Sequence, residues 1–326
     1  MKDVLKVSSI WCYSSVQDSI LVNLLKILSK KKIIFSSPKD ADILFLGPYN
    51  LFKFDSRFFN YIKRKIKNKF FYKIISDYEN GISFRKTKPL TIYYSLENLR
   101  YDNIDADFYI THDLGSSKSN HFRMPAWKEY VDWSHLGIKR EILKNHHSSR
   151  YGMYYSINKL TEPLGKDFLN KKRDVCFITS NLSEPKRSIY EIIKKSFNID
   201  GYGAAFDKNI KNHSSSNFTK HDILKNYAFN LCPNNSIYPG YYEDRTVDAF
   251  HSGTLALTWV DSHVNFDFNT KSFVNLYDHI KDNYDEICNQ LKDDIFLKKF
   301  VNEPLLYKSP DLNKEINFIN NILSRL

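Results

Sequence analysis

The chain has 326 residues, of which 42% are hydrophobic, and it carries 48 Lys and Arg against 37 Asp and Glu, for a formal net charge of +11. This length allows two ordinary domains, and this hydrophobic fraction excludes an intrinsically disordered protein. The basic balance is compatible with nucleotides, nucleic acid or anionic membrane surfaces as partners, and equally with simple solubility.

The cysteines and the apolar runs indicate the cellular compartment in which the protein is expected. Cys12, Cys176, Cys232 and Cys288 form no CxxC pair and no zinc-ligand spacing, so we expect small buried residues in a reducing compartment. No apolar run approaches the roughly 20 residues that span a bilayer, and residues 1–10 lack the apolar core of a signal peptide. We therefore expect a cytoplasmic protein, attached to a membrane only at its surface if at all.

Strand-like runs alternate with helical patterns along both halves of the chain. The runs are continuously apolar rather than alternating, which is typical of parallel strands covered by helices on both faces. We expect strands at 41–47, 90–94, 107–110, 175–178, 228–232, 255–260 and 273–277. We expect helices at 16–29, 58–72, 186–196, 244–251, 279–291 and 312–326. This alternation predicts an α/β fold in each half.

The composition changes between Lys159 and Arg173. This segment contains Pro163, Gly165 and a basic run at 171–173, without an apolar strand pattern. We place the domain linker here, which predicts domains at residues 1–160 and 161–326.

The expected helix at 58–72 is amphipathic and strongly basic. Phe58, Ile62, Ile66 and Phe70 recur every four residues, and lysines and an arginine fill the gaps. Such a helix can lie on an anionic membrane surface, but an ordinary surface helix that covers a core has the same pattern. A peripheral membrane contact near residues 58–73 is therefore one of two open interpretations.

Metal-binding patterns are weak in this sequence. Asp105 and Asp107 form a DxD pattern similar to the metal site of many sugar transferases, but Asp107 directly precedes an expected strand, where a role at the strand entry is simpler. The histidines show no HExxH or zinc spacing. We expect no bound metal.

The most informative stretch is residues 227–262, YAFNLCPNNSIYPGYYEDRTVDAFHSGTLALTWVDS. It predicts a strand, a polar loop, a helix that begins near Glu243 and ends at Gly253, and a second strand. Nucleotides bind at such corners of parallel sheets, because free N–H groups and the helix dipole favour phosphate at the helix N-terminus. The stretch therefore indicates a diphosphate site.

This stretch resembles the donor-binding motif of the α-1,3/4-fucosyltransferases, especially the bacterial ones, which is approximately FNLCFENS…GYVTEK…DA…S…IP…W. The segment 268–275, FNTKSFVN, is similar to the family's FNPKSFVN. Upstream, YSLEN at 94–98 resembles the family's YTGEN, and RMP at 123–125 its RMP or RLP. SN at 180–181 with PKR at 185–187 resembles the family's SN…APxR.

The chain departs from the family pattern at several positions. Pro233 and Asn234 replace Phe-Glu, and the family's Thr-Glu-Lys is Glu243-Asp244-Arg245 here. Asp is one methylene shorter than Glu, and Arg is a planar fork rather than a point charge. These changes keep a nucleotide site but bear on which donor sugar it takes.

The resemblance implies a GT-B fold, in which two Rossmann-like domains face each other across a cleft. The N-terminal domain would hold the acceptor and the C-terminal domain the donor. The implied activity is an inverting glycosyltransferase that moves fucose or a related deoxysugar from GDP-fucose or a related GDP-sugar to a hydroxyl of a glycan. The acceptor would be an oligosaccharide or lipid-linked glycan of the cell-surface polysaccharide or lipopolysaccharide type. No metal is implied.

The resemblance also assigns roles to residues. Glu97 would be the general base, and Arg187 and Arg245 would stabilise the departing diphosphate. Five further residues would bind the donor: Ser180, Asn181, Asn235, Tyr241 and Asp244. From the sequence alone, the alternative for Glu97 is a turn carboxylate, for Arg187 a surface cation, and for Asp244 an acid that complements a helix dipole.

Two alternatives stay open at this point. Within the enzymes, the chain could transfer another GDP-linked deoxysugar. From another class, it could be a basic nucleic-acid-binding protein, but it contains no RRM, KH or zinc-finger pattern. We therefore expect no nucleic-acid partner.

Overall fold

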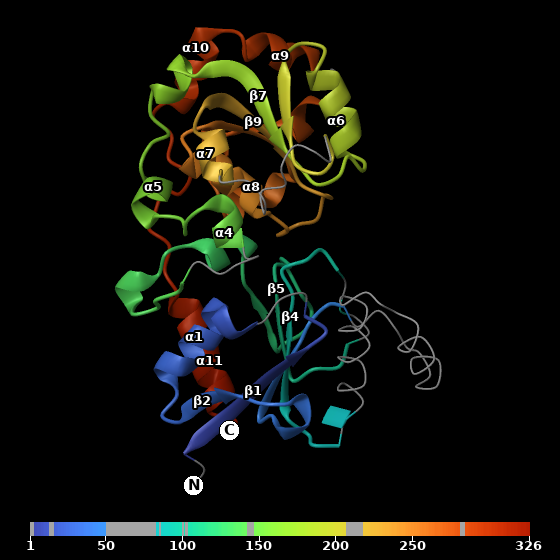
Figure 1. Cartoon of the computed structure of the whole chain (residues 1–326), viewed down its shortest axis with the longest axis vertical. Coiled ribbons are helices and arrows are strands. Elements are labelled where there is room, and N and C mark those ends of the chain that lie inside the picture. The colour runs from blue at the N-terminus through green and yellow to red at the C-terminus, as the bar shows by residue number, and fades with distance from the viewer. Residues whose placement is uncertain are drawn as a thin grey trace. The chain divides into compact units, whose positions relative to one another are not determined.

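A computed structural model of the chain describes residues 3–12, 16–49, 83–84, 86–99, 101, 104–141, 147–206, 218–280 and 284–326. The chain divides into two compact units (Figure 1). Unit 1 comprises Met1–Met124 and Asp311–Leu326, and unit 2 comprises Pro125–Pro310. The expected helix at 58–72 lies outside the described residues.

Unit 1 contains a six-stranded parallel sheet in the order β2-β1-β3-β4-β5-β6. Its central strands β3 and β5 are buried along their whole length, as the continuous apolar runs predict. The strands are β1 (Val4–Ile10), β2 (Lys32–Phe35), β3 (Ile43–Leu46), β4 (Leu90–Tyr94), β5 (Phe108–Thr111) and β6 (His121–Arg123).

The last helix of the chain completes unit 1. Helix α1 (Ile20–Leu28) begins at Ser19, whose hydroxyl accepts a hydrogen bond from the backbone N–H of Val22. Helix α11 (Asn313–Leu323) packs beside α1 (Figure 1). Its Phe318 stacks on Phe122 of β6, with ring centroids 4.7 Å apart. The predicted C-terminal helix is therefore confirmed, and it belongs to the same unit as the N-terminal strands.

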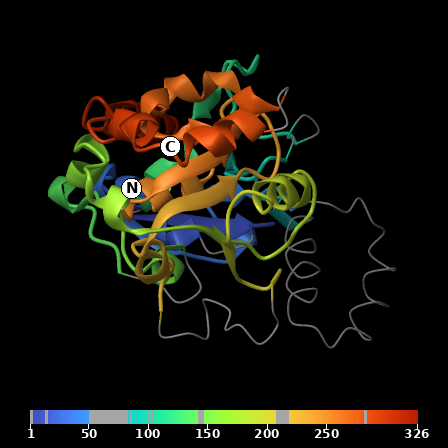
Figure 2. The ribbon, with the colours of Figure 1, turned by 90° about the horizontal axis from the view of Figure 1, so that it is seen from above.

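Unit 2 contains a five-stranded parallel sheet in the order β11-β10-β9-β7-β8. The strands are β7 (Lys172–Ile178), β8 (Ile199–Tyr202), β9 (Tyr227–Pro233), β10 (Leu255–Trp259) and β11 (Val274–Asn275). The helices are α4 (His147–Tyr151), α5 (Ile157–Thr161), α6 (Lys186–Ile193), α7 (Lys220–Leu224), α8 (Asp244–His251), α9 (Asp285–Gln290) and α10 (Asp294–Leu297). Helices α9 and α10 lie along one side of strands β9 and β10 (Figure 2).

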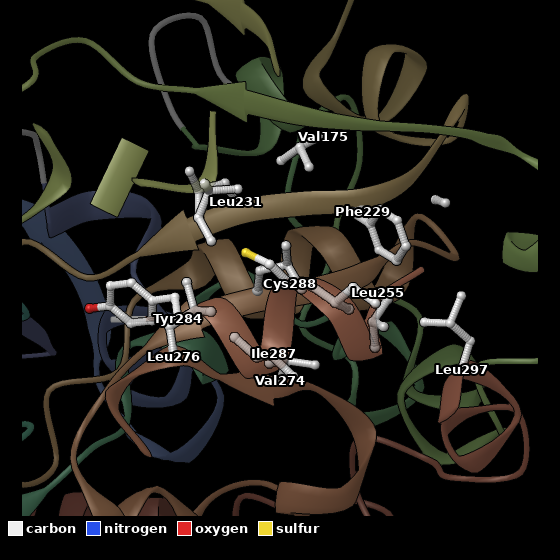
Figure 3. Close-up of a cluster of buried hydrophobic side chains, with 14 of the residues drawn as sticks. Val175, Phe229, Leu231, Leu255, Val274, Leu276, Tyr284, Ile287, Cys288 and Leu297 are labelled. Carbon is white, nitrogen blue, oxygen red and sulfur yellow. The ribbon is translucent and has the colours of Figure 1, made fainter. Parts of the chain in front are cut away.

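The core of unit 2 forms between these helices and the sheet. Phe229 and Leu231 of β9 lie in one buried cluster with Leu255 of β10 and with Ile287 and Cys288 of α9 (Figure 3). All four cysteines are free thiols, and Cys288 packs here as a small apolar residue. This core holds β9 rigid, and β9 carries the loop in which the diphosphate site was expected.

The segment taken from the sequence as a linker, Lys159–Arg173, lies inside unit 2. Phe168 is fully buried in the core of that unit. The backbone of Leu164 and Gly165 is bonded to Glu303 and Val301, at 3.1 and 2.9 Å. The segment is mostly polar, but it packs through the buried Leu160 and Phe168, through Leu164 and Leu169, and through these backbone hydrogen bonds. The compact units meet in sequence at 124–125 and 310–311 instead.

None of the helices in the described part of the chain combines the length and apolarity needed to cross a bilayer.

Candidate functional site

Two loops leave the carboxyl ends of neighbouring strands in unit 2. Residues 179–185 connect β7 to α6, and residues 234–243 connect β9 to α8. Because β7 and β9 are parallel partners, both loops and both helix N-termini lie at the same edge of the sheet. The predicted succession of strand, loop, helix and strand at 227–262 is confirmed, with α8 beginning at Asp244.

The loop after β9 is closed by its own polar side chains. The side-chain amide of the buried Asn234 donates to the carbonyl of Tyr241 at 2.8 Å. The backbone N–H of Asn235 donates to Oε1 of Glu243 at 2.8 Å. Glu243 is the N-cap residue of α8, but its carboxylate reaches across the loop instead of capping the helix. The N-terminal N–H groups of α8 are therefore not capped by this side chain.

Arg245, in the first turn of α8, holds the loop from the helix side. Its Nε lies 3.0 Å from Oε2 of Glu243, and its Nη1 donates to the carbonyl of Pro233 at 3.0 Å. Its Nη2 lies 3.4 Å from the side-chain oxygen of Asn235. The side chain is about one-fifth exposed, at 20%. A guanidinium held on both sides has a fixed direction, which suits the recognition of phosphate.

Helix α8 is also anchored by a buried carboxylate. Asp248, 1% exposed, accepts a hydrogen bond from the hydroxyl of Tyr155 at 2.7 Å and from Nζ of Lys220 at 2.9 Å. Lys220 Nζ also lies 3.6 Å from Oδ2 of Asp244. Asp244 is therefore paired with a cation of α7, and α8 is locked in position and rotation.

A buried histidine extends this anchor. Nε2 of His251 accepts the backbone N–H of Ser156 at 3.0 Å, so the neutral ring carries its proton on Nδ1, which lies 2.7 Å from the hydroxyl of Tyr151. Burial, and then the neighbouring His221, lowers the pKa of His251 to about 4. The ring is therefore neutral at pH 7.

The loop after β7 presents the other predicted donor residues. Ser180 and Asn181 are exposed, and Oδ1 of Asn181 accepts the hydroxyl of Ser183 at 2.8 Å. Arg187 is also exposed, and its Nε donates to the carbonyl of Leu182 at 3.1 Å. The structure thus brings Arg245 and Asn235 into contact and places Arg187 on the outer side of α6.

Lys186, which the sequence analysis did not select, is the buried cation of this loop. It is 1% exposed. Burial first, and then the charge of Arg245, lowers its pKa to about 8, while Glu243 acts in the opposite direction. The spacing of Lys186 with the buried Ile189 and Ile193, at i, i+3 and i+7, is the sequence signal that could have found it.

Glu97, the predicted base, lies in unit 1. It lies three residues after the end of β4, and its backbone N–H donates to the hydroxyl of Ser95 at 3.2 Å. The backbone N–H of Ser95 is bonded to Ile110 of the neighbouring strand β5 at 3.1 Å. This places an exposed carboxylate on a rigid backbone at the carboxyl edge of the sheet.

The DxD aspartates have a structural explanation. Oδ2 of Asp107 accepts the backbone N–H and the hydroxyl of Thr91, at 2.7 and 2.8 Å. This is the strand-entry role expected from the sequence. Within the ranges that the structure describes, no three His, Cys, Asp or Glu side chains gather in a way that could hold a metal ion.

Comparison with known proteins identifies the segment that carries this site. The C-terminal model of glycosyltransferase family 10 (fucosyltransferase) matches residues 168–297. The resemblance is confirmed. This segment contains both loops and all the predicted donor-binding residues. The α-(1,3)-fucosyltransferase FucT of Helicobacter pylori is 31% identical over 157 residues, which are 47% of this chain and 30% of FucT. The chain thus aligns with less than a third of that relative's length.

Solved structures extend the likeness to both units. The crystal structure of an α1,3-fucosyltransferase covers 98% of this chain and 90% of its own, with a TM-score of 0.66 and 20% identity. A crystal structure of an α1,3-fucosyltransferase with GDP-fucose gives a TM-score of 0.64 at 20% identity, over 98% of this chain and 90% of its own. At this identity the likeness shows the fold. The predicted GT-B fold, α/β with two parallel sheets, is confirmed.

Proposed function

We propose that this protein is an inverting glycosyltransferase that transfers fucose, or a related deoxysugar, from a GDP-sugar to a hydroxyl of a glycan. One observation carries the proposal: Arg245 is fixed by Glu243 and Pro233 at the N-terminus of α8, inside the segment that resembles the fucosyltransferases. A directed guanidinium beside uncapped helix N–H groups suits the diphosphate of a nucleotide sugar.

The donor would lie along the two loops at the carboxyl edge of the unit 2 sheet. Its diphosphate would lie by Arg245 and the N-terminus of α8. Five other residues of these loops and helices would contact the ribose, phosphates or sugar: Ser180, Asn181, Asn235, Tyr241 and Asp244. Arg187 would contribute a second guanidinium, its exposed side chain turning from the carbonyl of Leu182 to the ligand.

The reaction would be a single displacement. Glu97 would take the proton of the acceptor hydroxyl as the oxygen forms a bond to the anomeric carbon, and the bond from that carbon to the phosphate oxygen would break. The configuration at the anomeric carbon inverts, and GDP departs with the bonding electrons. Arg187, Arg245 and the helix N-terminus would stabilise the charge that grows on the diphosphate.

In this proposal, unit 1 serves the acceptor and unit 2 the donor. The acceptor would be an oligosaccharide or a lipid-linked glycan of the cell-surface polysaccharide or lipopolysaccharide type. The protein would be cytoplasmic, and the basic segment near 58–73 would contact an anionic membrane face, since lipid-linked acceptors lie there.

The residues at 243–245 favour an alternative donor sugar. The family's Thr-Glu-Lys is Glu243-Asp244-Arg245 here, and Asp244 is engaged by Lys220. A shorter carboxylate that is already paired with a cation changes the polar surface near the sugar. Another GDP-linked deoxysugar is therefore the alternative donor.

A screen of GDP-sugars that measures GDP release tests the proposal. We expect turnover with GDP-fucose or a related GDP-deoxysugar and a glycan acceptor. We also expect GDP to raise the melting temperature, by mass action on the folded state, while a generic oligonucleotide does not. Stabilisation by the oligonucleotide and not by GDP would instead favour the nucleic-acid-binding alternative.

A further inference from the structure

Lys186 occupies an unusual position for a lysine. It is the first residue of α6, and it lies on the face that Ile189 and Ile193 bury against the sheet. Only 1% of the residue is exposed. Lysine is almost never fully buried unless it is paired. A cation in the first turn also opposes the helix dipole, which favours negative charge there.

The ammonium group of Lys186 has no partner of its own in the described part of the chain. Its Nζ is buried and makes no hydrogen bond to any residue that the structure describes. The charges that act on it are those of Arg245 and Glu243. Glu243 is already bonded to Nε of Arg245 and to the backbone of Asn235. Lys186 and Arg245 therefore both face the carboxylate of Glu243, while Asp244, whose charge also acts on Arg245, lies 3.6 Å from Nζ of Lys220.

The direction of the side chain follows from the fold. Helix α6 begins at the carboxyl edge of β7, next to the loop after β9. Side chains of an α-helix lean toward its N-terminus, so a lysine in the first turn extends toward that edge. Lys186 thus approaches the loop that Arg245 and Glu243 close, whereas the side chain of Arg187, the next residue, is exposed to solvent.

We infer that Lys186 binds the diphosphate of the nucleotide sugar together with Arg245, an inference that rests on the proposed function. A diphosphate would give the buried ammonium group the hydrogen-bond acceptors that the protein does not supply. Its negative charge would also offset the repulsion between the ammonium group of Lys186 and the guanidinium of Arg245. Glu243 then acts as a positioning residue that holds Arg245 in the apo protein.

Isothermal titration with GDP and with guanosine tests this role in Lys186→Met. Methionine keeps an unbranched apolar side chain in the buried site and removes the charge. One hydrogen bond to a charged group is worth enough that GDP should bind about 10- to 100-fold more weakly. Guanosine, which has no phosphate, should bind both proteins equally. Lys195→Met, the same substitution at an exposed lysine just beyond α6, should bind GDP like the parent.

Proton uptake provides a readout that a merely structural lysine would not give. The pKa of about 8 is set by burial, by Arg245 and by Glu243. Near pH 8.5 the free amine is therefore largely neutral, and a bound diphosphate raises its pKa, so GDP binding should take up about half a proton or more. Titrations in buffers of different ionisation enthalpy measure this uptake. It should be absent in Lys186→Met.

The possible outcomes separate the two proposals. If the parent protein fails to bind GDP, the proposed function is overturned. If the parent binds GDP but takes up no proton near pH 8.5, or if folded Lys186→Met binds GDP as tightly as Lys195→Met, only the role of Lys186 is overturned. The uptake measurement uses the parent protein, so it decides the question even if Lys186→Met does not fold.

Discussion

Replacing Arg245 with alanine removes the guanidinium on which the proposed donor site depends. In the structure this group makes an ion pair with Glu243 at 3.0 Å and donates to the carbonyl of Pro233 at 3.0 Å. A hydrogen bond between charged groups is worth about 1.5–3 kcal/mol, so GDP should bind at least about tenfold more weakly. The charge on the leaving diphosphate is larger in the transition state, so kcat should fall by a further factor of about 10² to 10³.

Arg245→Lys is the matched control. It keeps the positive charge and restores the residue that the family pattern has at this position, but a lysine cannot bond to Glu243 and Pro233 through a planar fork. We expect partial activity from Arg245→Lys and almost none from Arg245→Ala. Steady-state GDP release and GDP titration measure the two effects, and the melting temperature without ligand shows whether the loop has lost stability. An Arg245→Ala protein that binds GDP and turns over like the parent would refute the placement of the donor site.

Three further predictions concern the base, metal dependence and pH. Glu97→Gln should lower kcat by about 10² to 10⁴ while GDP titration shows unchanged affinity, and near-normal turnover by the folded variant would contradict its role as base. EDTA should leave GDP release unchanged, whereas activity lost in EDTA and restored by Mn²⁺ or Mg²⁺ would show that Asp105 and Asp107 bind metal. The pKa of His251 is lowered from 6.5 to about 4, so the neutral buried ring contributes fully to the free energy of unfolding above pH 6.5. Up to about 3 kcal/mol of that free energy is lost as the pH falls toward 4. Urea unfolding at pH 7 and near pH 4.5 measures this loss. The free energy of unfolding should fall less between the two pH values for His251→Phe than for the parent, and an equal fall would contradict the role of His251.

Apolar runs and turn residues in the sequence predicted many of the strands and helices of unit 2, because an apolar run marks the residues that become buried. The run at 228–232 is continuously apolar, and it forms β9, which is buried along its whole length. Helix α8 begins at Asp244 and ends at His251, as the polar loop before it and Gly253 after it predict. Strands β2, β6 and β8 were not predicted, since they are short edge strands whose residues are only half-buried or exposed. Their pairing comes from the neighbouring strand rather than from their own apolar pattern. Strand β1 was not predicted either, since Lys6, Ser8 and Ser9 interrupt its apolar run.

The domain boundary could not be obtained from composition. A polar segment with Pro163 and Gly165 has the composition of a linker, yet the buried side chains of Leu160 and Phe168 and several backbone hydrogen bonds hold it in unit 2. Helix α11 joins unit 1 because Phe318 packs on Phe108 and Phe122, which lie about 200 residues earlier in the chain. Contacts at such sequence separation leave no local signal.

The sequence by itself determined the α/β alternation and the resemblance to the fucosyltransferases, and it predicted a diphosphate site in the loop between β9 and α8. Its motif also pointed to Arg187, one of two adjacent cations at the start of α6. The spacing of Lys186 with Ile189 and Ile193 already puts it on the apolar face of α6, but only the tertiary structure decided which charged groups this rotation of the helix brings it against. That rotation buries Lys186 against the charges of Arg245 and Glu243 and leaves Arg187 exposed. The local sequence shows which face of the helix Lys186 lies on, but the charged groups that face it there come from a loop some 50 residues further along the chain.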